Sequence, residues 1–237
     1  MILDHTTLIL AGSPQRFPNT EGGDLSKYSF MIGDESLIEH ISQTYFGANS
    51  YLTIYEHEDA AIPKNLSNNL RLIGKTQGAL ISALLSLEER NLDKPLFIVP
   101  GDSLIRRDRY EKFVEDATKN NADISVVVFK SDNSNYSYVR TRDRKLVEVC
   151  EKKVISSNAT AGIFYFSTAR LFLECAEWAI TYNIRTNDNF YVAPCLNFAV
   201  IQNFKIKLFE ILEDDYFRFS NYEEALNSRE RFIRGSS

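Results

Sequence analysis

The sequence TLILAGSPQRFPNTEGGDLSK, residues 7–27, indicates how this chain folds. Its first five residues predict a buried strand, which runs directly into Gly12 and Ser13 and is followed by Arg16 and Lys27. A turn of small residues exposes backbone N–H groups, and the two long side chains add fixed positive charge. This arrangement is typical of a phosphate site. The alternative is an ordinary strand-to-loop connection that happens to carry two cations.

The composition is that of a globular protein with a substantial core. With 237 residues, 44% of them hydrophobic and 12% aromatic, the chain can bury roughly 70% of its unfolded surface. The formal net charge of -5 argues against a general affinity for nucleic acid, which requires many Lys and Arg contacts to phosphates.

Three widely spaced cysteines, Cys150, Cys175 and Cys195, contain no CxxC pair and predict free thiols in a reducing compartment. The N-terminus lacks a charged segment followed by an apolar one, and no apolar run approaches the length of a membrane span. We therefore expect a cytoplasmic protein without a membrane partner.

Short apolar runs alternate with segments of helical period, a pattern that predicts βαβ units. The expected strands are residues 7–11, 51–55, 70–74, 96–100, 124–129, 136–140, 146–150, 162–166 and 206–211. The expected helices are residues 36–46, 77–90, 171–180, 191–202 and 222–232. We therefore predict an α/β fold: a Rossmann-like, mostly parallel mixed sheet flanked by helices in three layers. Because no linker interrupts the chain, residues 1–237 should form a single domain.

A carboxylate is expected beside the small-residue loop. Ligands of open α/β sheets bind outside the carboxyl ends of the strands, which is where the loop after Ala11 begins. The strand at 96–100 ends at the same edge in Gly101 and Asp102. A carboxylate beside bound phosphates is the usual way of holding Mg²⁺. An aspartate after a strand can equally cap the following turn, so Asp102 alone does not identify a metal site.

Taken together, these segments resemble the nucleotidyltransferase family that includes sugar-nucleotide pyrophosphorylases and cytidylyltransferases. The resemblance runs nearly end to end and depends on the order of its motifs. The matching segments are LAGSPQRF at 10–17, LSKYSFMIGDESLIEHI at 25–41, QGAL at 77–80, IVPGDSLI at 98–105, EKKVISSNATAGIFYF at 151–166, NFYVAPCLNFAV at 189–200 and YFRFSNYEEAL at 216–226. The resemblance implies a sheet of the GT-A type, with a nucleotide-binding half at about residues 1–130 and an acceptor-binding half at about residues 131–237.

The resemblance also implies roles for individual residues. The nucleotide would contact Leu10, Ala11, Gly12, Ser13, Gln77 and Gly78. Arg16 would stabilise charge as pyrophosphate leaves, Lys27 would hold the phosphate under attack, and Asp102 would bind Mg²⁺. These roles suit a transfer that depends on positioning and on cancelling charge.

Three further residues are implied as contacts of the acceptor molecule: Glu151, Lys152 and Gly162. Lys152 would bind the acceptor through its phosphate. For Glu151 and Lys152 the alternative is a solvated charge pair at the end of a strand.

The loop departs from the family pattern in two ways. Pro14 stands where the family usually has a second glycine, and proline lacks the N–H that could bind a phosphate. Glu21 and Asp24 place negative charge close to the expected triphosphate.

The last segment departs from the pattern as well, because Arg218 stands where the family has a second metal-binding aspartate. Asp214 or Asp215 could replace that aspartate if the strand end is shifted. Alternatively, Arg218 could clamp a phosphate through its planar fork.

We therefore predict an Mg²⁺-dependent nucleotidyltransferase. It would transfer a nucleoside monophosphate from a nucleoside triphosphate to a phosphorylated small molecule, with a sugar 1-phosphate as the expected acceptor, and release pyrophosphate. Surface polysaccharide or related small-molecule biosynthesis is the expected setting, and a homo-oligomer is left open. Two other hypotheses stay open: a weakly active or inactive relative that binds a nucleotide or nucleotide sugar, and a glycosyltransferase that uses a nucleotide sugar.

Overall fold

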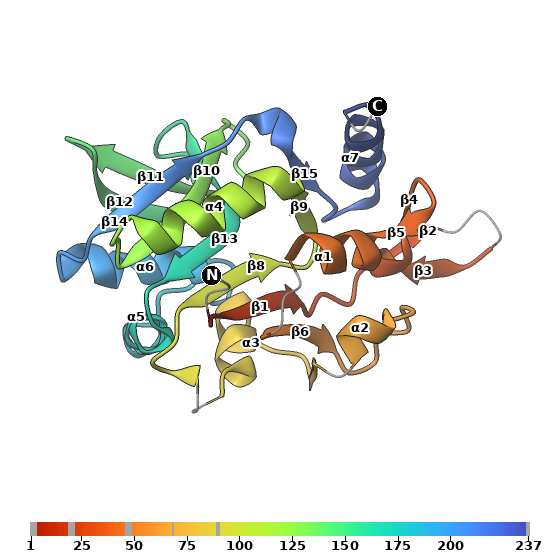
Figure 1. Ribbon diagram of the computed structural model, residues 1–237, viewed down its shortest axis with the longest axis horizontal. Coiled ribbons are helices and arrows are strands. Elements are labelled where there is room, and N and C mark those ends of the chain that lie inside the picture. Colours follow the sequence, from red (N-terminus) through yellow and green to blue (C-terminus); the bar gives the residue numbers. More distant parts are fainter. Residues whose placement is uncertain (1–3, 19–21, 46–48, 68, 89–90, 236–237) are drawn as a thin grey trace.

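Helices cover both faces of a central nine-stranded sheet in the computed structural model of the protein (Figure 1). The structure describes residues 4–18, 22–45, 49–67, 69–88 and 91–235. Within these ranges, no helix is both long enough and apolar enough to cross a membrane.

Parallel strand pairs gather around β1 (Thr6–Ala11), which lies between β6 (Ser50–Tyr55) and β8 (Leu96–Pro100), and β6 pairs in parallel with β7 (Leu70–Ile73). The antiparallel strand β13 (Asn158–Phe166) joins β8 to the second half of the sheet. That half contains β10 (Ile124–Lys130), β11 (Ser137–Arg142), β12 (Lys145–Glu151) and β14 (Ile206–Glu210). The predicted α/β fold with a mixed sheet is confirmed.

The sheet has two apolar faces, because successive residues of a strand point to opposite sides. Ile9 and Val99 belong to one buried cluster, whereas their neighbours Leu8 and Ile98 belong to the other. All four residues are at most 1% exposed. A sheet that is apolar on both faces has to be covered on both faces, which explains the three layers.

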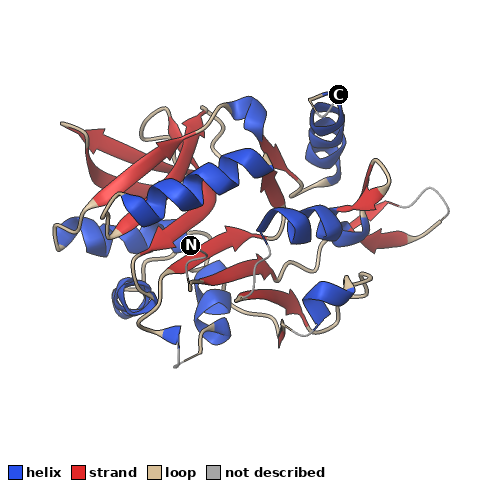
Figure 2. Cartoon of the chain, viewed as in Figure 1, coloured by secondary structure: helices blue, strands red, loops and turns tan. Residues whose placement is uncertain are grey.

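The helices divide between these two clusters. Residues of α1, α2, α4 and α7 belong to the cluster that contains Ile9, and residues of α3, α5 and α6 belong to the other cluster. The bounds are α1 Leu37–Tyr45, α2 Lys64–Ser67, α3 Ala79–Ser86, α4 Arg107–Lys119, α5 Ala169–Thr181, α6 Val192–Ile201 and α7 Tyr222–Arg234. Figure 2 distinguishes the helices, in blue, from the red strands that they cover.

Three helices differ most from the sequence prediction, and one of them is the short α2, which was not predicted. The helix predicted at 77–90 is α3, which begins after Gly78 because the φ of this glycine is 106°. It ends at Ser86, where the next residue becomes extended, and residues 89–90 lie outside the described ranges. The helix α4 is absent from the prediction, although Tyr110, Phe113 and Ala117 form its buried face at helical spacing. The many charged residues around them hid this pattern.

Short two-stranded pairs also lie outside the strands that the sequence predicted. β2 (Arg16–Pro18) pairs with β3 (Asp24–Ser26), and β4 (Met31–Ile32) pairs with β5 (Glu35–Ser36). β9 (Ser103–Ile105) pairs with β15 (Tyr216–Arg218), although these strands are far apart in the sequence. The last pair brings the C-terminal segment beside Asp102.

Candidate active site

A cleft of about 830 Å³ opens at the carboxyl ends of β1 and β8. Among the residues predicted for the site, its wall contains Leu10, Gly12, Ser13, Gly78, Asp102, Glu151, Lys152 and Gly162. The structure therefore brings the predicted loop, the carboxylate and the acceptor residues together in one cavity. Ala11 is fully buried at the end of β1. Arg16, Lys27, Gln77 and Arg218 also lie outside the lining.

The close approach of two strand ends places Asp102 beside the loop. The N–H of Gly101 donates to the carbonyl of Leu10 at 2.8 Å, and a Cβ on Gly101 would lie 2.6 Å from that of Ala11. Only glycine permits this approach. Gly12 is less constrained, because an added Cβ would come no closer than 3.3 Å to Ile73 and its φ is not positive. The loop therefore does not depend on a left-handed backbone conformation at Gly12.

Lys27 is buried and paired with Asp102. Its side chain is 1% exposed at the start of the short 3-10 helix η1 (Lys27–Ser29), and its Nζ lies 3.0 Å from Oδ2 of Asp102. Burial by itself would raise the pKa of Asp102. The charge and hydrogen bond of Lys27, with the charge of Arg218, outweigh this effect and lower the pKa of Asp102 below its ordinary value. Asp102, whose side chain is 34% exposed in the cleft wall, is therefore held as a carboxylate.

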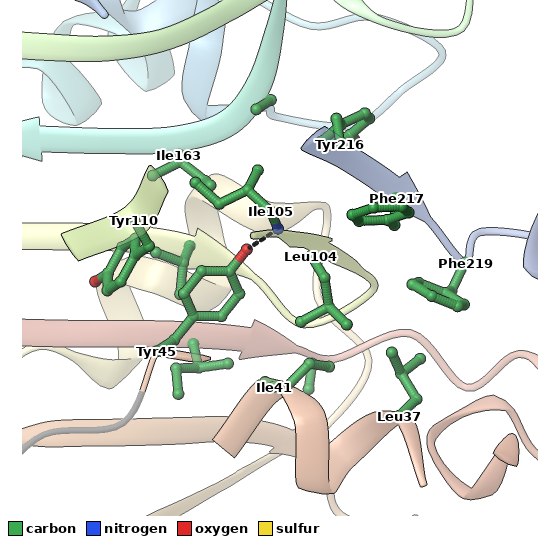
Figure 3. Packing of buried hydrophobic residues seen from close by; sticks show 14 of the residues in the cluster. Leu37, Ile41, Tyr45, Leu104, Ile105, Tyr110, Ile163, Tyr216, Phe217 and Phe219 are labelled. Carbon is green, nitrogen blue, oxygen red and sulfur yellow. Dashed lines mark hydrogen bonds between the residues drawn. The ribbon is translucent and has the colours of Figure 1, made fainter. Parts of the chain in front are cut away.

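Hydrogen bonds also fix the backbone around Asp102. The N–H of Phe219 donates to the carbonyl of Asp102 at 2.8 Å, next to the β9–β15 pair. From α1, the hydroxyl of Tyr45 accepts from the N–H of Ile105 at 3.1 Å and donates to the carbonyl of Ser103 at 3.3 Å. Figure 3 shows the hydrogen bond between Ile105 and Tyr45 among packed apolar side chains. Asp102 thus stands at the edge of a rigid part of the core.

Arg16 lies outside the cleft lining and binds a different aspartate. Its guanidinium donates to both carboxylate oxygens of Asp59 at 3.2 and 2.9 Å, and to the carbonyl of Asp24 at 2.6 Å. The two side chains of the pair are 43% and 56% exposed. Their hydrogen bond raises the pKa of Arg16 and lowers that of Asp59. Pro14 lines the cleft, Asp24 is exposed in β3, and Glu21 lies outside the described residues.

The second half supplies a carboxylate and an ammonium group to the cleft. Glu151 accepts a hydrogen bond from the hydroxyl of Ser137, and burial raises the pKa of Glu151 despite that bond. Lys152 donates to the hydroxyl of Tyr191 at 2.8 Å, and its φ is 53°. A left-handed conformation at a residue other than glycine is strained and is often found at functional sites.

Gly162 lies where the register between β10 and β13 shifts, and its φ is 74°. Its Cα faces the ring of Pro100, which an added Cβ would approach at 3.6 Å. The irregularity therefore brings β13 against the end of β8 at the cleft.

Backbone hydrogen bonds connect residues 77–80, in the first half of the chain, to Phe190 in the second half. The N–H of Phe190 donates to the carbonyl of Gln77 at 2.8 Å, and the N–H of Leu80 donates to the carbonyl of Phe190 at 3.1 Å. A Cβ on Gly78 would lie 2.3 Å from the Phe190 oxygen, so only glycine fits there. Gln77 itself is exposed and lies outside the cleft lining.

Arg218 lies opposite Ser103 in the β9–β15 pair and lines a separate cavity of about 110 Å³. It donates to Ser220 at 2.8 Å and to Glu224 at 3.2 Å. Its guanidinium also lies over the ring of Tyr136, 5.0 Å from the ring centre.

Asp214 and Asp215 do not join Asp102. Asp215 is paired with Arg109 at 2.9 Å and with Arg106 at 3.5 Å, and its side chain is 9% exposed. Asp214 is 95% exposed beside Arg231. The structure therefore gives no support to the idea that either aspartate replaces a second metal ligand.

Of the residues that the structure describes, Asp102 lines the cleft at the strand end next to the loop and is the candidate ligand for a metal ion there. Among the described residues, no group of three His, Cys, Asp or Glu side chains could hold a metal ion. Mg²⁺ needs only one or two protein carboxylates when waters and substrate phosphates complete its octahedron. Asp102 fits such an ion, because Lys27 contacts only Oδ2 of its carboxylate and leaves Oδ1 for the metal.

Several residues of the cleft wall were not predicted from the sequence: Tyr55, Lys75, Thr76, Ser82, Asn189 and Tyr191. Tyr55 ends β6, and Lys75 and Thr76 follow β7. The rule that ligands bind at the carboxyl ends of parallel strands predicts all three, as it predicted Asp102. The oxygens of Thr76 and Ser82 lie 2.7 Å apart at the start of α3.

A curated relative matches two thirds of the chain. Bifunctional protein GlmU of Thermodesulfovibrio yellowstonii is 29% identical over 171 residues, which cover 67% of this chain and 35% of that protein. The chain therefore spans about a third of the length of this relative.

Two solved structures share the fold over nearly the whole chain. A nucleoside-diphosphate-sugar pyrophosphorylase from Vibrio cholerae RC9 is 18% identical, with a TM-score of 0.79 and coverage of 95% of this chain and 99% of that one. The inositol-1-phosphate CTP transferase from T. maritima is 15% identical, with a TM-score of 0.69 and coverage of 98% and 95%.

The sequence model of one family matches residues 24–191, which include Lys27, Asp102, Glu151 and Lys152. This segment is well over half of the chain and contains most of the residues that line the cleft, although the loop at Gly12 and Ser13 precedes it. The protein therefore belongs to the nucleotidyl transferase family.

Proposed function

We propose that this protein transfers a nucleoside monophosphate from a nucleoside triphosphate to a phosphorylated small molecule, with a sugar 1-phosphate as the acceptor class, and releases pyrophosphate. One observation carries the proposal. A carboxylate fixed by a buried lysine, Asp102 with Lys27, shares a cleft of about 830 Å³ with Glu151 and Lys152. A cavity of this size is large enough for two small substrates.

In the proposed reaction, a phosphate oxygen of the acceptor attacks the α-phosphorus of the nucleotide. A new P–O bond forms while the bond from the α-phosphorus to the oxygen that bridges to the β-phosphate breaks. Pyrophosphate leaves with the electron pair of that bond. The transfer needs alignment and cancellation of negative charge more than it needs a protein nucleophile.

The first half of the cleft would bind the nucleotide. The loop at Gly12 and Ser13 offers backbone N–H groups, while Pro14 offers none. Lys75, exposed at the mouth of the cleft, adds positive charge for the phosphates. The base would lie beside Gly78, which lines the cleft at the start of α3 and lets the backbone of Phe190 approach closely.

Asp102 would hold Mg²⁺, which supplies positive charge at the transferring phosphoryl oxygens when it is bound. Lys27 keeps the carboxylate of Asp102 ionised and in one place. Lys27 is fully buried and does not line the cleft, so its side chain as placed makes no direct contact with a phosphate bound there.

The second half of the cleft would bind the acceptor. Lys152 suits a phosphate, and Tyr191 holds the ammonium of Lys152 at the cleft. Glu151 offers carboxylate oxygens to acceptor hydroxyl groups. The backbone of Gly162 leaves space beside Pro100 for the acceptor.

A weakly active or inactive nucleotide-binding relative is the second candidate, and two observations favour it. Arg16, proposed to stabilise the leaving pyrophosphate, binds Asp59 outside the cleft lining. Arg218, proposed as a phosphate clamp, is turned to Glu224. A glycosyltransferase receives no comparable support, because the family match is to nucleotidyl transferases.

One sheet joins strands from both halves, which supports the proposal of a single domain. A cytoplasmic location, a homo-oligomeric state and a role in polysaccharide biosynthesis stay predictions.

The direct test measures pyrophosphate release with Mg²⁺ from a matrix of nucleoside triphosphates and sugar 1-phosphates. We expect one pair to give turnover that Asp102→Asn removes. Tight nucleotide binding by calorimetry without pyrophosphate from any pair would replace the first candidate with the second. Failure to bind any nucleoside triphosphate would reject both.

A further inference from the structure

Asp102 is already paired with the ammonium of Lys27. Without this ammonium, a free divalent cation could bind the carboxylate of Asp102 with no positive charge beside it. The Nζ of Lys27 lies 3.0 Å from Oδ2, and the residue is fully buried, so this charge cannot turn out to solvent. A buried ammonium is stable only with a partner. Lys27 and Asp102 therefore form a pair that is already neutral.

A second cation adds to this effect. The β9–β15 pair places Arg218 opposite Ser103, and the charge of Arg218 contributes to the lowered pKa of Asp102. Glu224 neutralises part of the charge of Arg218, so Lys27 is the dominant cation at Asp102. Among the described residues, no group of three or more His, Cys, Asp or Glu side chains could hold a free metal ion in place of Asp102.

A free metal ion and a metal–nucleotide complex differ in charge. A free divalent cation is repelled by Lys27, by Arg218 and by the exposed ammonium of Lys75 at the mouth of the cleft. The complex of one divalent cation with a triphosphate has a net negative charge and is attracted by the same three side chains. These three charges therefore favour the complex over the free ion.

We infer that Lys27 is a positioning residue that keeps free divalent cations off Asp102, so that the metal enters the cleft only as a complex with the triphosphate of the nucleotide. The inference rests on the proposed function and specifies the form in which this site takes its nucleotide substrate. It assigns to Lys27 an effect on Asp102 in place of a direct contact with the phosphate under attack.

The size of the effect follows from Coulomb attraction and repulsion. A unit charge about 5 Å from a divalent cation changes its affinity about tenfold even with the screening of water. Replacing Lys27 with a neutral residue should therefore tighten the binding of a free cation. A lysine whose ammonium lies away from Asp102 in the nucleotide-free protein would leave that affinity nearly unchanged.

The experiment measures Mn²⁺ binding to the full chain without nucleotide, from the free Mn²⁺ signal in electron paramagnetic resonance. We expect Lys27→Met to bind Mn²⁺ about tenfold more tightly than the wild type. Lys27→Arg keeps the charge and should bind like the wild type. The double variant Lys27→Met/Asp102→Asn should lose the gain.

Lys112→Met is the matched control for overall charge. Lys112 is exposed and lies 3.3 Å from Asp108, so this variant also removes a lysine from beside an aspartate. It should bind Mn²⁺ like the wild type. In the wild type, tight Mn²⁺ binding should appear only when a nucleoside triphosphate is added.

An unchanged or weaker Mn²⁺ affinity in Lys27→Met would overturn the inference, and so would a gain that persists in the double variant. Circular dichroism checks that each variant is folded, and Lys27→Gln serves in place of Lys27→Met if the latter is not. These measurements involve no turnover. They therefore stand even if the pyrophosphate assay rejects the proposed function.

Discussion

The two cations that follow β1 form ion pairs of nearly equal length in opposite environments. Lys27 lies 3.0 Å from Asp102 with a side chain that is 1% exposed, whereas Arg16 lies 2.9 Å from Asp59 with a side chain that is 43% exposed. Water screens the Arg16–Asp59 pair and can solvate both of its side chains if the pair is broken. Water cannot solvate the buried ammonium of Lys27 in the same way. The comparison teaches that burial, more than distance, decides what an ion pair contributes.

The largest effect is expected from Asp102→Asn, which leaves the ammonium of Lys27 buried without its carboxylate. An uncompensated buried charge costs about 3–5 kcal/mol of unfolding free energy. Loss of the metal-binding carboxylate should also reduce turnover about 10³-fold. Urea unfolding and pyrophosphate release measure the two effects. Asp59→Asn is the matched control. Equal unfolding midpoints for the two variants would show that the buried and the exposed pair contribute equally to stability.

A smaller loss is expected from Lys27→Met. The carboxylate left behind is 34% exposed and can be solvated, so the unfolding free energy should fall by about 1–3 kcal/mol. Urea unfolding of this variant beside Asp102→Asn tests the asymmetry of the pair. A greater loss in Lys27→Met than in Asp102→Asn would mean that the unpaired carboxylate of Asp102 costs more stability than the unpaired ammonium of Lys27.

Acid should weaken the buried pair in a defined direction. The pKa of Asp102 is lowered in the folded protein from an ordinary value of 3.8, so its contribution is complete above that value. The contribution is lost as the pH falls through the folded pKa, because the unfolded chain then binds more protons. Urea unfolding between about pH 5 and pH 3 should show a shallower pH dependence in Asp102→Asn than in the wild type. Identical slopes would place the acid sensitivity elsewhere.

The smallest effect on stability is expected at the exposed pair. Arg16→Ala and Asp59→Asn should shift the urea midpoint only slightly, because exposed ion pairs contribute little to folding. The two substitutions should differ in their effect on turnover. Arg16→Ala should lose about 10²-fold if Arg16 reaches the leaving pyrophosphate, whereas Asp59→Asn should not lose turnover. Equal losses in both variants would show that the Arg16–Asp59 pair itself is required.

Much of the site followed from one rule about strand ends. The predicted strand at 96–100 has the same bounds as β8, and Asp102 reaches the cleft with Gly12 and Ser13 because parallel strands share a carboxyl edge. The same rule, applied to the strands at 51–55 and 70–74, would have added Tyr55 and Lys75. The contacts between distant segments were not predictable, since the spacing of residues 102 and 219 says nothing about their hydrogen bond.

By itself, the sequence determined the α/β fold, the edge of the sheet that binds ligands and the residue types gathered there, because these depend on local periodicity and strand order. Only the tertiary structure decided that Lys27 is buried against Asp102 while Arg16 stays exposed with Asp59. Both cations follow the same strand, and their difference depends on which distant segments pack over them. Burial and charge pairing are properties of the packed chain, so the role of each cation could not be read from residues 7–27 alone.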